Sequence, residues 1–159
     1  TPRSSRTINE KMPDLTVKRI EEILSRGGGS FDGSIVSILG VSFKSNTGDM
    51  RNSPAIKIAN DLSNLGATVR VYDPLVAIED FDSFSVSEIC SDVHSATDGA
   101  DMIAVFSPHK EIVELDLTEL RSKTSDDCWF FDGRRAYNPK EVIESGFMYS
   151  AIGGVAYER

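Results

Sequence analysis

The sequence contains few of the residues that build disulfide frameworks and metal sites. Its 159 residues include two cysteines and two histidines. The cysteines, Cys90 and Cys128, have no CxxC spacing and are too few for a disulfide framework or a set of zinc ligands. We therefore expect no metal, a reducing compartment such as the cytoplasm, and two thiols that are buried as small apolar side chains.

Positive charge and long apolar runs are also scarce. With 17 basic and 25 acidic residues the formal net charge is −8, whereas proteins that bind nucleic acids need a cationic surface. No segment is long and apolar enough to span a bilayer, and residues 1–10 lack the apolar stretch of a secretory signal. We expect neither a nucleic acid nor a membrane as a partner, and an anionic ligand would need a local cluster of cations and backbone N–H groups.

What the sequence does contain is a regular alternation of apolar and amphipathic segments. Residues 13–24 have a helical apolar stripe that begins with Pro13, and the glycine-rich residues 26–33 follow as a flexible connector. Beyond the connector the patterns predict strands at residues 35–43, 68–72, 102–106, 128–131 and 147–152, helices at 54–65 and 139–145, and weaker helical segments at 86–89, 93–97 and 117–121.

Apolar strands that alternate with helices indicate a parallel sheet with helices on both faces. The predicted fold class is therefore α/β, a Rossmann-like doubly wound parallel sheet in a single domain preceded by a helix. We assign residues 1–33 to the helix and linker and residues 34–159 to the Rossmann-like domain.

The loop after the first predicted strand leads two cations into the start of a helix. Ligands of open parallel sheets collect at the carboxyl ends of strands, and the free N–H groups of a helix N-terminus favour an anion. Lys44 and Arg51 add full positive charges, and Ser53 is a suitable N-cap for the following helix. A phosphate is the ligand that fits, although both cations could instead pair with Asp49 or other acidic neighbours.

A second cationic loop, Asp132 to Arg135, follows the fourth predicted strand and should lie at the same edge of the sheet. A guanidinium can bind phosphate or ribose oxygens in a forked geometry. Arg134 and Arg135 therefore either join the first loop in an anion site or are two solvated arginines beside an aspartate.

No motif of catalysis accompanies these loops. The GxGxxG fingerprint and the Walker loop are absent after the first strand. Asp73 follows the second strand, where an acid can bind a ribose, but the Asp-Pro pair favours a simple turn. We place His109 at the rim of the site, His94 at the surface and Trp129 in the core, and we predict no catalytic residue.

Several segments carry a more specific pattern when they are taken together. They are ILGVSFK (38–44), NTGDMRNSPA (46–55), GATVRVYDP (66–74), Ala100-Asp101, FDGR (131–134), Gly146-Phe147 and Ile152-Gly153. This combination resembles the carboxy-terminal domain of the UDP-glucose/GDP-mannose (nucleotide-sugar) dehydrogenase family, and most of all its UDP-glucose and UDP-N-acetylmannosamine dehydrogenases. Residues 8–13 are similar to the end of the central helix of that family.

The resemblance implies a domain that closes over the UDP part of the substrate in an NAD-dependent UDP-sugar 6-dehydrogenase, which oxidises the sugar to a uronic acid. By position, Phe43, Lys44 and Arg134 would contact the UDP-sugar, and Arg51 would reach the pyrophosphate of NAD. Members of the family hold NAD mainly in an amino-terminal domain, and they form homodimers through the central helix. Such a protein would be cytoplasmic.

This chain departs from the family pattern at some positions, so the sequence does not decide whether the sugar of the substrate is glucose or N-acetylmannosamine. The family more often has Arg-Glu-Ser-Pro at residues 51–54 and Thr-Glu-His at residues 107–109, where this chain has RNSP and SPH. Residues 12–13 and 51–54 lean toward the N-acetylhexosamine branch. Neither Cys90 nor Cys128 lies in the catalytic cysteine motif of the family, so this segment by itself should oxidise nothing. The alternative is a non-catalytic module with the same fold that binds a nucleoside phosphate or a partner.

Overall fold

A computed structural model describes residues 2–26, 31–82 and 84–153, with side chains from residue 11 onwards. Within these ranges six parallel strands form one sheet in the order β3-β2-β1-β4-β5-β6. The strands are β1 (Ile35–Leu39), β2 (Thr68–Tyr72), β3 (Glu88–Ile89), β4 (Met102–Val105), β5 (Trp129–Asp132) and β6 (Met148–Ala151). This order is that of a doubly wound nucleotide-binding sheet, so the predicted α/β Rossmann-like fold class is confirmed.

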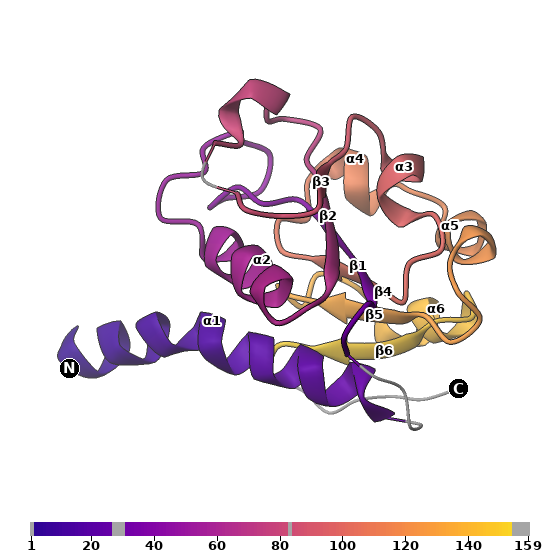
Figure 1. The fold of residues 1–159 in the computed structure, drawn as a ribbon, viewed down its shortest axis with the longest axis horizontal. Coiled ribbons are helices and arrows are strands. Elements are labelled where there is room, and N and C mark those ends of the chain that lie inside the picture. Colours follow the sequence, from indigo (N-terminus) through magenta and orange to yellow (C-terminus); the bar gives the residue numbers. More distant parts are fainter. Residues whose placement is uncertain (1, 27–30, 83, 154–159) are drawn as a thin grey trace.

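Helices cover both faces of the sheet, as Figure 1 shows. The helices are α1 (Pro2–Leu24) and α2 (Pro54–Asn64) on one face, and α3 (Val93–Thr97), α4 (Lys110–Val113), α5 (Leu117–Lys123) and α6 (Pro139–Glu144) on the other. Neighbouring residues of a strand point to opposite faces. In β1, Val36 and Ile38 therefore join the core beneath α1 and α2, whereas Leu39 joins the core on the opposite face.

Helix α2 forms where the sequence predicts, and its N-terminus lies at the edge of the sheet where the ligand is expected. Ser53 caps the helix by accepting a hydrogen bond from the N–H of Ala55 at 3.3 Å, and Pro54 occupies the first turn. Ile58 and Leu62 lie in its buried stripe and pack into the core. The cap and the stripe together fix where this helix begins and which way it faces.

The first helix and the first strand differ in extent from the prediction. Helix α1 begins at Pro2 and contains Pro13 in its interior, so the predicted start at residue 13 is wrong. Pro13 has no N–H for the helix ladder, but its ring is buried and the helix continues past it. Strand β1 ends at Leu39 because Gly40 adopts a φ of 76°, and a Cβ at this glycine would collide with the carbonyl oxygen of Ser107.

Three short elements were not predicted correctly, among them the 3₁₀ helix η2 (Ile78–Asp80), for which the sequence analysis predicted no helix. The helical segment predicted at residues 86–89 is wrong, because Glu88 and Ile89 pair with Arg70 and Val71 as edge strand β3. Helix α4 is absent from the prediction. The remaining predicted strands and helices coincide with observed elements to within two residues. Among the described residues, no helix combines the length and the apolar character needed to cross a membrane.

Candidate functional site

The carboxyl ends of four strands meet at one edge of the sheet. Leu39, the last residue of β1, pairs with Tyr72 of β2 and Val105 of β4, and Val105 pairs with Asp132 of β5. All four strands end at the same height in the sheet, so the loops that follow them lie next to one another. Doubly wound sheets bind their ligands at such an edge.

The two predicted cationic loops are in direct contact at this edge. The guanidinium of Arg134 donates a hydrogen bond from Nη2 to the backbone carbonyl of Phe43, at 2.7 Å. Lys44 is the next residue, and all three of these residues are exposed. The structure therefore brings together the three residues that the sequence assigned to the UDP-sugar.

A buried carboxylate shapes the second loop. Asp132 is fully buried and accepts hydrogen bonds from the N–H groups of Arg134 at 3.3 Å, Ala136 at 3.0 Å and Tyr137 at 2.9 Å. The hydroxyl of Tyr149 donates to the same carboxylate at 3.0 Å. These bonds fold the chain into a tight turn directly after β5. The aspartate in the predicted loop is therefore its internal anchor and does not lie beside the arginines as a surface partner.

The two arginines of this loop point to different places. Gly133 lies so close to β4 that a Cβ would come within 2.7 Å of the carbonyl oxygen of Val105, and this approach brings Arg134 to the loop after β1. Arg135 adopts a φ of 52° and donates from Nε to the carbonyl of Ile152, at 2.9 Å. Arg134 is therefore the arginine of this pair that meets the first loop.

A pocket opens between the two loops and the helices α1 and α2. Its wall includes Ser42, the first residues of α2 and Arg134, together with Met12 and Thr16 of α1. The N-terminus of a helix and a guanidinium both favour a negative charge. The geometry thus suits an anionic group that lies at the start of α2 beside Arg134.

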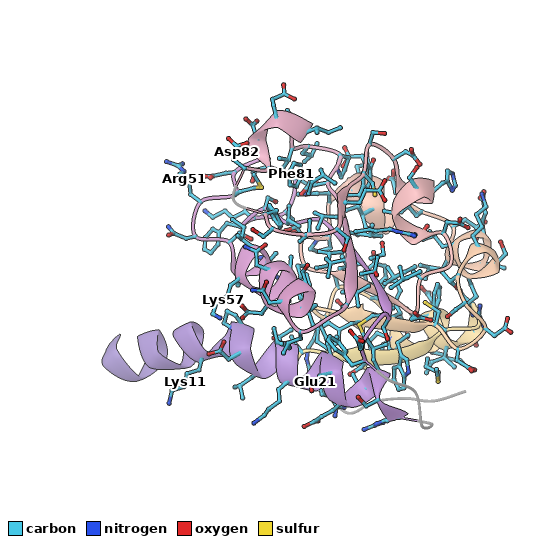
Figure 2. The ribbon with its side chains drawn as sticks, in the orientation of Figure 1. Lys11, Glu21, Arg51, Lys57, Phe81 and Asp82 are labelled. Carbon is cyan, nitrogen blue, oxygen red and sulfur yellow. The ribbon has the colours of Figure 1, made fainter. Side chains whose placement is uncertain are left out.

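Arg51 is held by Asp49 at the outer edge of the first loop. Its guanidinium contacts the carboxylate twice, with Nη2 at 2.8 Å and Nε at 3.0 Å. The hydrogen bond from this guanidinium lowers the pKa of Asp49 to about 2. The Arg51 side chain is nevertheless 87% exposed and projects from the margin of the molecule in Figure 2. In the described part of the chain Lys44 forms no ion pair.

Asp73 and His109 have a larger role in this edge than the sequence suggested. One oxygen of Asp73 accepts the N–H of Leu75 at 2.9 Å, which confirms the predicted turn, and the other accepts the N–H of Val41 at 2.8 Å. The prediction of His109 at the rim is wrong, because its side chain is fully buried and its Nε2 lies 2.9 Å from Asp73. The sequence signal for both residues was their position, since Asp73 follows directly on β2 and His109 lies in the segment after β4, and both strands flank β1.

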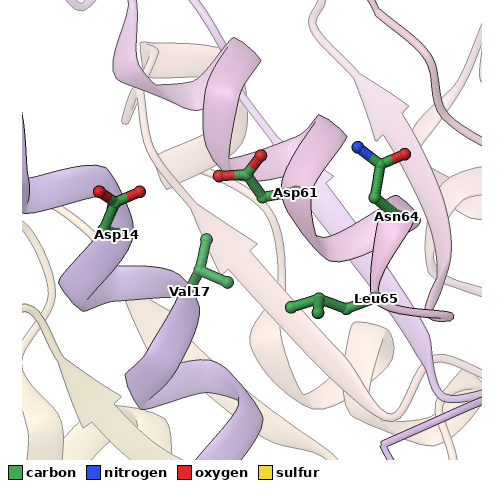
Figure 3. Close-up of a pocket in the computed structure, with 5 residues that line it drawn as sticks. All are labelled: Asp14, Val17, Asp61, Asn64 and Leu65. Carbon is green, nitrogen blue, oxygen red and sulfur yellow. The ribbon is translucent and has the colours of Figure 1, made fainter.

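A second hollow lies on the face of the molecule that α1 and α2 cover (Figure 3). Asp14 and Val17 of α1 face Asp61 of α2 and Leu65, the residue that follows this helix, across it. Lys57 bridges the two carboxylates, with Nζ 3.0 Å from Asp14 and 2.6 Å from Asp61. The acidic residues outnumber the basic one, so this hollow does not suit an anion.

Neither thiol is placed for catalysis. Cys90 and Cys128 are both buried, as predicted, and burial raises their pKa values to about 11 and about 12. A thiol becomes a nucleophile only as the thiolate, which burial disfavours. Within the described ranges, no group of three His, Cys, Asp or Glu side chains is arranged to hold a metal ion.

Comparisons with known proteins lead to the same kind of ligand. The model of the UDP-glucose/GDP-mannose dehydrogenase family, UDP binding domain, matches residues 37–139. The chain is 32% identical over 147 residues to UDP-glucose 6-dehydrogenase TuaD of Bacillus subtilis, covering 91% of this chain and 31% of that protein. It is 35% identical over 133 residues to UDP-glucose 6-dehydrogenase of Rhizobium meliloti, covering 83% of this chain and 30% of that one.

Solved structures agree with the sequence relatives. NDP-N-acetyl-D-galactosaminuronic acid dehydrogenase from Methanosarcina mazei superposes with a TM-score of 0.82 at 29% identity, over 94% of this chain and 30% of that one. UDP-D-ManNAc dehydrogenase from Pyrococcus horikoshii gives a TM-score of 0.78 at 28% identity, over 95% and 33%. The chain thus spans about a third of the length of the proteins it matches.

The matched segment includes the loop after β1, the start of α2 and the loop after β5, which contribute to the lining of the pocket at the start of α2. This chain therefore belongs to the UDP-glucose/GDP-mannose dehydrogenase family and contains its UDP binding domain.

Proposed function

We propose that this chain is the substrate-closing domain of an NAD-dependent UDP-sugar 6-dehydrogenase and binds the UDP part of the substrate. The observation that carries the proposal is the hydrogen bond from Arg134 to the carbonyl of Phe43. This bond holds one cation beside a second, Lys44, at the edge of the sheet where α2 begins. A diphosphate has the negative charge and the several oxygens that two cations and a helix N-terminus can bind together.

In this proposal Lys44 and Arg134 neutralise the diphosphate, and Phe43 offers apolar surface to the rest of the nucleotide. Phe43 is 45% exposed although it is a large apolar residue, which fits a side chain that a ligand covers. Arg51 reaches toward the pyrophosphate of NAD across the domain cleft. Its ion pair with Asp49 orients the guanidinium while leaving it at the surface.

Residues outside this chain hold NAD and supply the catalytic cysteine in the intact enzyme. NAD, when bound there, would supply the hydride acceptor for the oxidation of the alcohol to the acid. The residues of this chain bind the UDP-sugar, orient it and exclude water from the reaction. The high pKa values of Cys90 and Cys128 support a cysteine nucleophile that lies elsewhere.

The same proposal places the enzyme in the cytoplasm as a homodimer formed through the segment that contains α1. Leu15 on α1 is 63% exposed and Met12 is 37% exposed, so this helix has an apolar surface that a partner could cover. Sedimentation of the whole protein with and without Leu15→Glu tests the dimer. If the Leu15→Glu variant sediments as the same dimer, the proposal that α1 forms the interface is rejected.

Calorimetry with UDP tests the role of the cationic loops. We expect Lys44→Ala to weaken the affinity of the 159-residue chain for UDP by about tenfold to a hundredfold, because a hydrogen bond to a charged group is lost. Lys140→Ala, which removes an exposed lysine from α6, is the matched control and should leave the affinity unchanged. Equal affinities of the Lys44→Ala variant and the wild type would reject Lys44 as a diphosphate ligand.

A further inference from the structure

A single buried histidine connects the strand ends beneath the anion site. The side chain of His109 is fully buried, although it was predicted at the rim. Its Nδ1 lies 2.7 Å from the backbone nitrogen of Asn46, and its Nε2 lies 2.9 Å from Oδ2 of Asp73. Ser42 Oγ is 3.3 Å from the same Nε2. The ring therefore contacts the loop after β1 at two positions and the end of β2 at one.

These partners determine which nitrogen of the ring carries the proton. A backbone N–H can only donate, so Nδ1 must be an unprotonated acceptor toward Asn46. Nε2 then carries the hydrogen and donates it to the carboxylate of Asp73. The hydrogen of the ring therefore lies on Nε2, and a hydrogen on Nδ1 would remove the bond from the Asn46 N–H.

The bond to Asn46 matters because Asn46 is the last residue of the segment 43–46, which contains Lys44. Asn46 has a φ of 62°, and its side-chain Oδ1 accepts the N–H of Lys110 at 2.9 Å. At the start of this segment, Ser42 Oγ donates a hydrogen bond to the carbonyl of Lys44 at 2.7 Å. Ser107 Oγ donates a hydrogen bond to the carbonyl of Ser42. The segment after β4 therefore holds both ends of the loop that carries Lys44.

The arrangement of Ser42, His109 and Asp73 is not a hydrolytic triad. In such a triad the acid holds one ring nitrogen and the serine faces the other. Here Asp73 and Ser42 both approach Nε2, and Nδ1 is occupied by a backbone N–H. All three residues are buried. The geometry serves to fix a loop.

We propose that His109 is a positioning residue that, through its Nδ1 bond to Asn46, holds residues 43–46 in the shape that places Lys44 against the diphosphate. The inference rests on the proposed function for its ligand. Asp73 is the partner that holds the tautomer, because it accepts the Nε2 hydrogen while also accepting the N–H of Val41. Loss of the Nδ1 contact to Asn46 and loss of the Nε2 contact to Asp73 should therefore have different effects on the site.

Two conservative variants separate these contacts. In His109→Asn the amide oxygen takes the place of Nδ1 and can still accept the N–H of Asn46. In His109→Gln the terminal amide takes the place of Nε2 and can still donate to Asp73, but the acceptor for Asn46 is lost. We expect UDP affinity within about threefold of the wild type for His109→Asn and at least about tenfold weaker for His109→Gln, since one hydrogen bond that positions the loop is lost.

Nitrogen-15 spectra of the chain without ligand provide the readout that a merely structural role would not give. We expect the wild-type ring to show the Nε2–H tautomer, and the amides of residues 43–46 to move in His109→Gln while staying near their wild-type positions in His109→Asn. The Nδ1–H tautomer in the wild type, or equal displacement of these amides in both variants, would overturn the inference.

The two proposals fail in different ways. If the wild-type chain binds no UDP while the spectra behave as expected, the positioning role stands and the assigned ligand falls. If UDP binds the wild type and His109→Gln equally well, the positioning role falls and the UDP site stands. The tautomer is read on the wild type alone, so a variant that fails to fold does not remove the test.

Discussion

At the scale of single residues, the shape of the second cationic loop depends on one carboxylate. Asp132→Ala would leave the N–H groups of Ala136 and Tyr137 without their acceptor in a part-buried turn. We expect the free energy of unfolding to fall by roughly 2–3 kcal/mol, because several hydrogen bonds to one carboxylate are lost together and part-buried donors are only partly rehydrated. Urea unfolding measures this loss.

The control for that variant removes a single donor from the same carboxylate. Tyr149→Phe deletes the hydroxyl that donates to Asp132 at 3.0 Å and leaves the backbone bonds intact. Its cost should be about 1 kcal/mol. An equal cost for the two variants would mean that the carboxylate does not organise the turn.

The buried thiol of Cys128 makes stability depend on pH in the alkaline range. Burial raises its pKa from 9.0 to about 12, so the fold favours the protonated thiol. The contribution of this thiol to the free energy of unfolding is complete below pH 9. It is lost as the pH rises from 9 toward 12, because the thiol ionises in the unfolded chain before it ionises in the folded one. Urea unfolding under reducing conditions at pH 8 and pH 10 should show a larger loss in the wild type than in Cys128→Ala. The extra loss in the wild type between pH 8 and pH 10 should be about 1.4 kcal/mol in total, since the unfolded thiol ionises mainly above pH 9. Parallel losses in the two proteins would contradict this expectation.

Individual site residues could be predicted where charge and position in the chain were enough. Lys44 and Arg134 follow buried strands and carry charge, so their place at one edge followed from the fold class. His109 was misplaced because its environment depends on β2 and β4 flanking β1, an order that the sequence does not display. His109 is buried because the ends of β1, β2 and β4 lie side by side in the sheet.

At the scale of elements, the cap of α2 connects helix stability to the site. Ser53 accepts the N–H of Ala55 and donates to the carbonyl of Val41 in the loop after β1. We expect Ser53→Ala to lower the free energy of unfolding by about 1–2 kcal/mol and to weaken UDP binding, because both the cap and the loop contact are lost. Thermal unfolding and calorimetry measure the two effects.

The matched control is a cap on the other face of the sheet. Asn138 caps α6 by accepting the N–H of Lys140 at 3.0 Å, away from both cationic loops. Asn138→Ala should cost a similar free energy of unfolding, about 1 kcal/mol, and leave UDP affinity unchanged. If both variants weaken UDP binding equally, the effect of Ser53 is only a general loss of stability.

Most elements could be predicted because their signals are local. The N-cap, the apolar stripe and the following glycine defined α2, and apolar runs defined β2, β4 and β5. Strand β3 was missed because two residues acquire strand character only by pairing with the edge of β2. Helix α1 begins before Pro13, where local preference indicated a start, whereas its buried apolar residues Val17, Ile20 and Ile23 all follow that proline.

At the scale of the whole molecule, the sheet provides one edge at which separate parts of the sequence become a single surface. Phe43 and Arg134 are 91 residues apart and meet because β1 and β5 both flank β4. The net charge of −8 repels anions at long range, so binding relies on this local concentration of cations. The central claim is that the two loops form one diphosphate site.

Titration of the nitrogen-15-labelled chain with UDP tests that claim most directly, with uridine as the ligand that lacks the phosphates. The account predicts that UDP shifts the amides of residues 42–46, the first turn of α2 and residues 133–135 together along one binding curve, and that uridine shifts them far less. Shifts confined to one loop, or centred on the hollow between α1 and α2, would contradict it.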